Sequence, residues 1–271
     1  MKPTITPSSA PLLSAQQLSK RWGGLLAVDN VSIDLYRNQV HAVIGTNGAG
    51  KSTLINLLSG EFAPTSGTIH LLGHNISQLS QPKRANLGLG RSYQRNTVFN
   101  NFSVYENCRL SAQGKFQKPW QIWQSATSCQ KSCEMADKAI ALTGLESLTQ
   151  RPAGLLSHGQ KRQLEMAMCL ATGPEVLLFD EPLAGMGAEE TERMLALLAD
   201  LRTQYAILLV EHDMDAVFRI ADVITVMVNG AVIASGSPTA VRENEMVQAA
   251  YLGEHAWAPP KQSQLKQIGR A

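Results

Sequence analysis

The sequence predicts an α/β fold with a mostly parallel core sheet, an antiparallel β subdomain and a helical subdomain inserted into the chain. Short apolar runs that read as strands alternate with helical patterns along most of the chain. Two runs, residues 175–180 and 205–212, are almost continuously apolar, which is typical of strands buried on both faces of a parallel sheet. Residues 95 to about 155 show no strong strand pattern, which predicts the helical insertion.

The predicted elements follow one another in a regular order. In sequence they are a strand at 40–45, a helix at 52–60, a strand at 67–73, the helical insertion, the two buried strands, and a late hairpin at 223–236 that turns at Asn229-Gly230. An amphipathic helix joins the two buried strands and is marked by Met194, Leu197, Leu198 and Leu201. We therefore predict a folded domain over 12–254 with a helical subdomain over about 95–160. Flexible segments, 1–11 and 255–271, are predicted on either side because both are rich in proline and polar residues.

Composition excludes several classes of protein. The chain has 271 residues, 44% hydrophobic and 17% charged, which is typical of a globular protein with a sizeable core. Its net charge of +2 is too near neutral to indicate a nucleic-acid partner. The longest apolar runs, such as 206–210, are far too short to cross a bilayer. Cys129 and Cys133 could share a helix face, but no His lies near them in sequence, so we interpret them as reduced thiols rather than metal ligands.

The stretch "GTNGAGKST" matches the phosphate-binding pattern G-x-x-x-x-G-K-[ST] without a gap. It follows a predicted strand and opens a predicted helix, which is the context this pattern needs. Glycines let successive backbone N–H groups point at one centre, Lys51 adds a positive charge for the phosphates, and the Ser52 hydroxyl can bind Mg²⁺. We predict a P-loop NTPase fold and a nucleotide site formed by Gly45, Thr46, Asn47, Gly48, Ala49, Gly50, Lys51, Ser52 and Thr53.

Polar residues follow the buried strands at the edge where α/β sheets bind ligands. Asp180 and Glu181 end the run "VLLFDE"; we predict that Asp180 binds Mg²⁺ and that Glu181 deprotonates the attacking water. His212 ends the other strand and can contact the γ-phosphate and that water. Gln94, in "GRSYQ", follows a short strand and could reach the metal or the water from a loop, a weaker signal on its own.

The stretch "LLSHGQKRQLEMA" begins a predicted helix with an unusual residue in its first turn. Ser157 and Gln160 have the spacing of a capping box, whereas Gly159 costs about 1 kcal/mol relative to alanine inside a helix. One interpretation is a cap with a tight turn. The other is that the helix N-terminus is kept bare so that an anion can bind there.

Taken together, these motifs resemble the nucleotide-binding subunits of ABC transporters. The order matches over about residues 12–254: an aromatic residue (Trp22), Walker A at 45–53, a Q-loop glutamine (Gln94), the signature "LSHGQ" at 156–160, Walker B "LLFDE", and a switch histidine in "VEHD". The resemblance implies ATP hydrolysis with Mg²⁺, with Trp22 as the platform for adenine. Two ATPase chains would pair head to tail, so that Ser157, Gly159 and Gln160 of one chain meet the ATP of the other.

A narrower resemblance points to the ATPases of branched-chain amino acid importers, through "TVFNNFSVYENCRL", "DEPLAGMG", "LVEHDMD" and "YLGE". It implies membrane permease subunits, a second and different ATPase subunit, a solute-binding protein, and a place on the cytoplasmic face of the inner membrane. Urea importers and lipopolysaccharide-export ATPases share parts of this pattern. The chain departs from the common pattern at His158, in place of the first signature glycine, and at Gly187, where many relatives carry Asp.

Two other classes of protein fit the sequence less well. Soluble ABC ATPases of translation or DNA repair usually carry two cassettes or a long coiled-coil insertion, and neither pattern is seen here. A nucleotide-binding regulator without turnover would not need both Glu181 and His212. The sequence therefore favours a transport ATPase.

Overall fold

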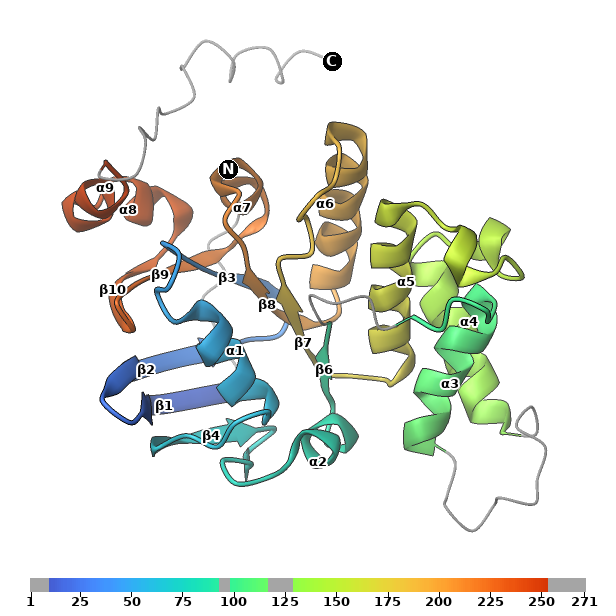
Figure 1. Cartoon of the computed structure of the whole chain (residues 1–271), viewed down its shortest axis with the longest axis horizontal. Helices are drawn as coiled ribbons and strands as arrows, with labels where there is room; N and C mark the ends of the chain where they lie inside the picture. Colours follow the sequence, from blue (N-terminus) through green and yellow to red (C-terminus); the bar gives the residue numbers. More distant parts are fainter. Residues whose placement is uncertain (1–9, 93–97, 117–128, 253–271) are drawn as a thin grey trace.

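The computed structural model describes residues 10–92, 98–116 and 129–252. These residues form two sheets with helices between and beside them (Figure 1). The predicted mixture of a parallel core sheet, an antiparallel β subdomain and a helical insertion is confirmed. Trp120 and Trp123, which fall in the insertion, lie outside the described residues, as do 1–9 and all of 255–271.

The core sheet has six strands in the order β10-β9-β3-β8-β7-β6. All neighbouring pairs are parallel except the late hairpin β9–β10, which is antiparallel as predicted. The strands are β3 (Gln39–Gly45), β6 (Leu89–Arg91), β7 (Val176–Asp180), β8 (Ala206–Val210), β9 (Val223–Val228) and β10 (Ala231–Gly236). Strand β8 lies between β3 and β7, so the chain segments that follow these three strands leave the sheet at one edge, side by side.

A second sheet is antiparallel, in the order β2-β1-β4-β5. It consists of β1 (Leu13–Trp22), β2 (Leu25–Leu35), β4 (Ser66–Leu71) and β5 (His74–Asn75). Helix α1 (Lys51–Ser59) packs between the two sheets, with Leu54, Ile55, Leu57 and Leu58 fully buried. Burial of this helix fixes the phosphate-binding loop, since the loop ends where α1 begins.

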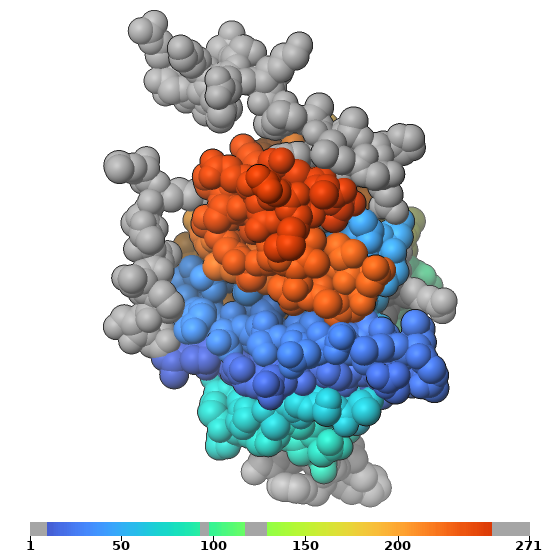
Figure 2. Space-filling model, turned by 90° about the vertical axis from the view of Figure 1, so that its left-hand side faces the viewer, coloured from blue at the N-terminus to red at the C-terminus, as the bar shows by residue number. Residues whose placement is uncertain are grey.

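Helices cover the other faces of the core sheet. The inserted helical subdomain holds α3 (Val104–Phe116) and α4 (Gln130–Leu142), which pack on α5 (His158–Ala171) (Figure 1). The remaining helices are α2 (Gln81–Asn86), α6 (Ala188–Arg202), α7 (Met214–Ile220), α8 (Pro238–Arg242) and α9 (Glu245–Leu252). Figure 2 shows the side of the molecule where α8, α9 and the β9–β10 hairpin lie over the antiparallel sheet; β10 lies against β2.

Candidate functional site

The phosphate-binding loop joins β3 to α1 and depends on glycine. Gly48 and Gly50 adopt φ angles of +79° and +98°, in the left-handed region that favours glycine. Gly50 is also the N-cap of α1, and a Cβ atom there would lie 2.4 Å from the carbonyl oxygen of Ala27. No other residue fits this position without moving the backbone of β2.

A cleft of about 400 Å³ lies over this loop. It is lined by residues 47–53 of the loop together with Leu25, Leu26, Ala27, Glu181, Asn229 and Gly230. The Lys51 ammonium donates to the carbonyl oxygens of Gly45 (2.7 Å) and Thr46 (3.0 Å), so all nine predicted P-loop residues take part in the cleft or hold its lysine. Burial lowers the pKa of Lys51, while Glu181 and Asp180 act in the opposite direction.

Trp22 stands at the end of β1 and is not among the residues that line this cleft. Trp22 is 46% exposed, and its ring packs edge-on against Phe62, at 5.0 Å between centroids. The Lys20 ammonium lies 4.3 Å from the ring centroid, where a cation–π attraction is expected. The structure therefore places Trp22 at the turn between β1 and β2, where it pairs with Leu25, and does not bring it against the loop.

Asp180 is the last residue of β7, and only 4% of its surface is exposed. Its Oδ1 atom has no hydrogen-bond partner among the described residues, and its Oδ2 lies 3.8 Å from the Arg91 guanidinium. Burial raises the pKa of Asp180; Arg91 and Lys51 lower it and Glu181 raises it further. An unpartnered buried carboxylate oxygen facing this loop has the chemistry of a ligand position for a hard cation.

Glu181 follows directly and lines the cleft with a strained backbone. Its φ angle is +50°, a conformation that costs a non-glycine residue about 1–3 kcal/mol. The backbone N–H of Glu181 donates to the Val210 carbonyl (2.9 Å), which holds the turn in place. His212 lies beside it, with Nδ1 4.0 Å from Glu181 Oε1. The structure thus brings together the two residues predicted to handle the attacking water.

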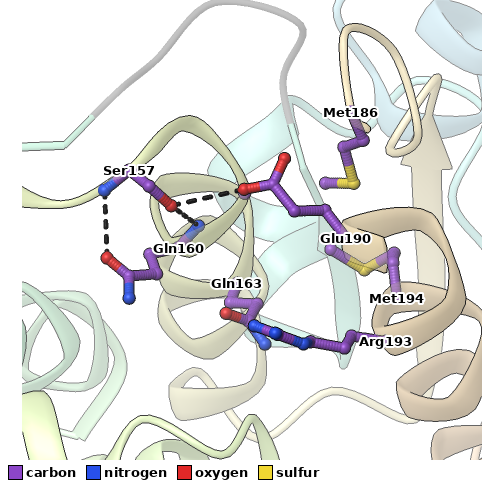
Figure 3. A pocket seen from close by; sticks show the side chains of 8 residues that line it. Ser157, Gln160, Gln163, Met186, Glu190, Arg193 and Met194 are labelled. Carbon is purple, nitrogen blue, oxygen red and sulfur yellow. Dashed lines mark hydrogen bonds between the residues drawn. The ribbon is translucent and has the colours of Figure 1, made fainter. Parts of the chain in front are cut away.

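The capping box at the start of α5 is confirmed. The Gln160 backbone N–H donates to the Ser157 hydroxyl (3.2 Å), and the Ser157 N–H donates to Gln160 Oε1 (3.0 Å). The His158 ring lies against Gly185, where an added Cβ would be 3.5 Å from Cε1. The N-terminus of α5 carries an anion from the same chain: Glu190 of α6 lies on it, with the Ser157 hydroxyl 3.4 Å from Glu190 Oε1 (Figure 3).

The pocket at the start of α5 and the cleft over the P-loop are separate. The pocket is lined by Ser157, Gly159, Gln160, Gln163, Met186, Glu190, Arg193 and Met194, none of which lines the cleft (Figure 3). Within the described part of the chain, therefore, the signature and the P-loop do not form one site.

Comparison with known proteins decides the family. A family model described as "ABC transporter" matches residues 28–184, more than half of the chain. The chain belongs to the ABC transporter ATP-binding family. A second model, "Branched-chain amino acid ATP-binding cassette transporter", matches residues 231–256 of this ABC ATPase.

Relatives and solved structures agree. The ABC ATPase is 38% identical to the high-affinity branched-chain amino acid transport ATP-binding protein BraF of Pseudomonas aeruginosa, over 91% of this chain and 99% of BraF. It is 39% identical to the corresponding protein LivG of Escherichia coli, with the same coverage. A nucleotide-free ATP-binding cassette from an ABC transporter superposes with a TM-score of 0.80 at 27% identity, covering 90% of this chain and all of that one. The ADP conformation of the ABC cassette MJ1267 gives 0.79 at 28% identity, with 91% and 100% covered. This chain is an ATP-hydrolysing subunit of a transporter, and no helix in its described part is long and apolar enough to cross a membrane.

Gln94, the predicted Q-loop residue, lies outside the residues that the structure describes. The strand before it ends in Arg91, which the sequence reasoning missed. The Arg91 guanidinium donates to Asn56 Oδ1 (2.6 Å), Ser59 Oγ (2.6 Å) and Glu61 Oε2 (3.0 Å), and so ties β6 to the end of α1. Nothing in the sequence around Arg91 indicates these contacts with α1.

Glu211 is a second residue of the ABC ATPase site that sequence reasoning missed. Its side chain is fully buried, and its carboxylate accepts from the backbone N–H groups of Leu183 (2.9 Å) and His212 (3.2 Å). Burial raises the pKa of Glu211, and these two N–H groups lower it. The carboxylate therefore joins the turn after Glu181 to the segment that carries His212. A charged residue at the end of a wholly apolar strand marks Glu211 as unusual in the sequence, but its contact with Leu183 depends on packing between distant segments.

Proposed function

We propose that this ABC ATPase powers the import of branched-chain, hydrophobic amino acids across a bacterial inner membrane. The observation that carries the proposal is 38–39% identity to BraF and LivG over 99% of their length. The C-terminal match to the branched-chain family model supports the same solute class over urea or lipopolysaccharide.

The nucleotide is ATP, bound over the P-loop. The Lys51 ammonium exchanges the carbonyls of Gly45 and Thr46 for the phosphate oxygens, and the backbone N–H groups of the loop add further donors. Trp22 stacks on adenine after Lys20 leaves its face. The Ser52 hydroxyl and Asp180 Oδ1 fit a Mg²⁺ ion, which when bound neutralises phosphate charge; the family resemblance adds Gln94 as a further ligand.

Hydrolysis depends on Glu181 and His212. Glu181 lines the cleft and, as general base, accepts a proton from the water that attacks the γ-phosphate. The neighbouring imidazole of His212 contacts the γ-phosphate and orients that water. The buried Glu211 carboxylate holds the segments that carry Glu181 and His212 in position, through its hydrogen bonds with the backbone N–H groups of Leu183 and His212.

A second ATPase chain completes each site. The start of α5 and the P-loop belong to separate pockets of one chain, which supports a head-to-tail pair in which Ser157, Gly159 and Gln160 meet the partner's γ-phosphate. Following the branched-chain importers, this partner is a different ATPase subunit, and the pair works with permease subunits and a solute-binding protein. The ATPase lies peripherally on the cytoplasmic face of the membrane.

Reconstitution tests the solute. Proteoliposomes that contain this ATPase, its partner ATPase and its permease subunits are expected to take up leucine, isoleucine and valine when ATP and the solute-binding protein are supplied. The measurement is uptake of labelled solute, with urea as the comparison. Uptake of urea without uptake of leucine would overturn the assignment of the solute.

The segment after Gln94 supplies a surface for the membrane subunits. Phe99 and Phe102 are 55% and 41% exposed, and their rings lie 5.5 Å apart between centroids, next to the start of α3. Exposed aromatic pairs of this kind are typical anchors of protein–protein interfaces. Their position between the core sheet and the helical subdomain fits a contact that moves when ATP binds.

Substitution of this aromatic pair is expected to impair transport more than hydrolysis. In the reconstituted transporter, Phe99→Ser with Phe102→Ser should lower ATP-driven uptake by about tenfold, because interface anchors of this kind carry much of the binding energy. The ATPase activity of the subunit without permease should change by less than about twofold, since neither ring touches the P-loop cleft. Met246→Ser, at a residue that is 60% exposed on α9, is the control. Equal losses of uptake and hydrolysis would contradict a coupling role.

A further inference from the structure

A carboxylate from a neighbouring helix lies on the N-terminus of α5. Glu190, in the first turn of α6, accepts a hydrogen bond from the Ser157 hydroxyl at 3.4 Å. A Cβ atom built on Gly159 would lie 2.5 Å from Glu190 Oε1 and 2.6 Å from its Cδ, so the carboxylate lies directly over the glycine. The contact joins the helical subdomain to a helix that starts just beyond Walker B.

Glycine at position 159 leaves room for the Glu190 carboxylate. A Cβ atom there would meet the end of the flexible Glu190 side chain, so a larger residue would require that carboxylate to move aside. Gly159 is also buried, with Met186 and Met194 beside the same pocket. The pocket beside the Glu190 carboxylate has a volume of about 40 Å³.

Electrostatics favour an anion at this point. Helix α5 has no acidic residue in its own first turn, so Glu190 supplies the negative charge that a helix N-terminus stabilises. Among the described residues, Glu190 has no ion pair: Arg193, one turn further along α6, pairs with Glu189 instead. The Ser157 hydroxyl and the positive end of α5 are therefore the groups that hold the Glu190 carboxylate.

We propose that Glu190 is an internal anion that occupies the γ-phosphate position of the signature and must be displaced before two ATPase chains can close on ATP. The inference rests on the proposed function, in which the same hydroxyl and helix N-terminus receive the partner's γ-phosphate. A carboxylate and a phosphate oxygen compete for the same donors, and their like charges repel each other at contact distance. ADP has no γ-phosphate to displace Glu190, so the contact favours the separated state until ATP is bound again.

The competing explanation is structural. If Glu190 serves only to hold α6 against α5, its removal loosens the signature and makes closure harder. The two explanations predict opposite shifts in the ATP concentration needed for closure, which makes them separable by one measurement.

The experiment uses the full transporter with its natural ATPase partner, in a Glu181→Gln background where bound ATP is not consumed. Closure is followed by cysteine crosslinking across the ATPase pair as ATP is raised. Glu190→Gln keeps the shape of the side chain and removes its charge. Glu189→Gln is the matched control: the neighbouring residue carries the same charge but is exposed and paired with Arg193 away from Ser157.

Competition predicts that Glu190→Gln lowers the ATP concentration for half-maximal closure by about threefold to tenfold, since a partly exposed charge interaction is being removed. Glu189→Gln should shift it by less than about twofold. An equal shift in both variants, or a higher ATP requirement with Glu190→Gln, would overturn the proposal that Glu190 competes with the γ-phosphate. If the Glu181→Gln parent itself does not close with ATP, the proposed head-to-tail function fails, and the inference fails with it.

Discussion

Lys51→Ala is expected to abolish ATP hydrolysis while the fold stays intact. The Lys51 ammonium is the cationic group among the residues that line the P-loop cleft, and its contacts in this structure are two loop carbonyls that need no lysine to remain folded. Loss of one preorganised cation at a phosphoryl group lowers turnover by at least about a hundredfold.

Turnover at saturating Mg-ATP, together with the thermal unfolding midpoint, checks this expectation. Lys83→Ala, at an exposed lysine of α2, removes the same charge away from the cleft and should leave turnover unchanged. Undiminished hydrolysis in the Lys51 variant would contradict the assignment of the cleft as the nucleotide site.

Glu181→Gln should also stop hydrolysis but preserve ATP binding. The amide keeps the size of the side chain and an acceptor oxygen, while the group that accepts the proton from water is lost. General-base catalysis contributes about 10²–10⁴-fold, so turnover should fall by roughly a thousandfold. Bound ATP should accumulate, which equilibrium binding of labelled ATP will measure.

Glu175→Gln is the matched control for this variant. Glu175 directly precedes β7, whereas Glu181 directly follows it, and Glu175 forms a surface ion pair with Arg37. Its substitution should leave both turnover and ATP binding nearly unchanged. Comparable loss of turnover in the two variants would mean that Glu181 has no special role as a base.

Features that depend on local geometry were predictable from the sequence. The P-loop requires glycines at fixed spacing between a strand and a helix, and the structure has them there. The capping box at Ser157 and Gln160 involves residues three apart, so its pattern is visible in one turn of sequence. The strand-end positions of Asp180, Glu181 and His212 followed from the apolar runs before them, and the order β3-β8-β7 brings those ends together.

Features that depend on contacts between distant segments were not predictable. Glu190 and Ser157 are 33 residues apart, and Glu211 accepts from Leu183, 28 residues earlier. The Arg91 side chain, at the end of β6, donates hydrogen bonds to residues of α1. In each case one ordinary polar residue acquires its role from packing between elements, and no periodicity or motif in the sequence records that packing. For Trp22 the motif was visible in the sequence, but the place of its ring was not: the ring packs against Phe62 and not on the P-loop cleft.

In the proposed pair, the signature of one chain binds the ATP held by the other. ATP-dependent closure of the Glu181→Gln protein with its natural partner, measured with and without Ser157→Arg, tests this arrangement. Ser157→Thr keeps the hydroxyl and an N-cap residue, and is the control. A stable closed pair is expected with serine or threonine at this position and none with arginine, whose side chain would fill the γ-phosphate site. A closed pair that forms equally well after Ser157→Arg would contradict this arrangement, and the start of α5 would then be a helix cap alone.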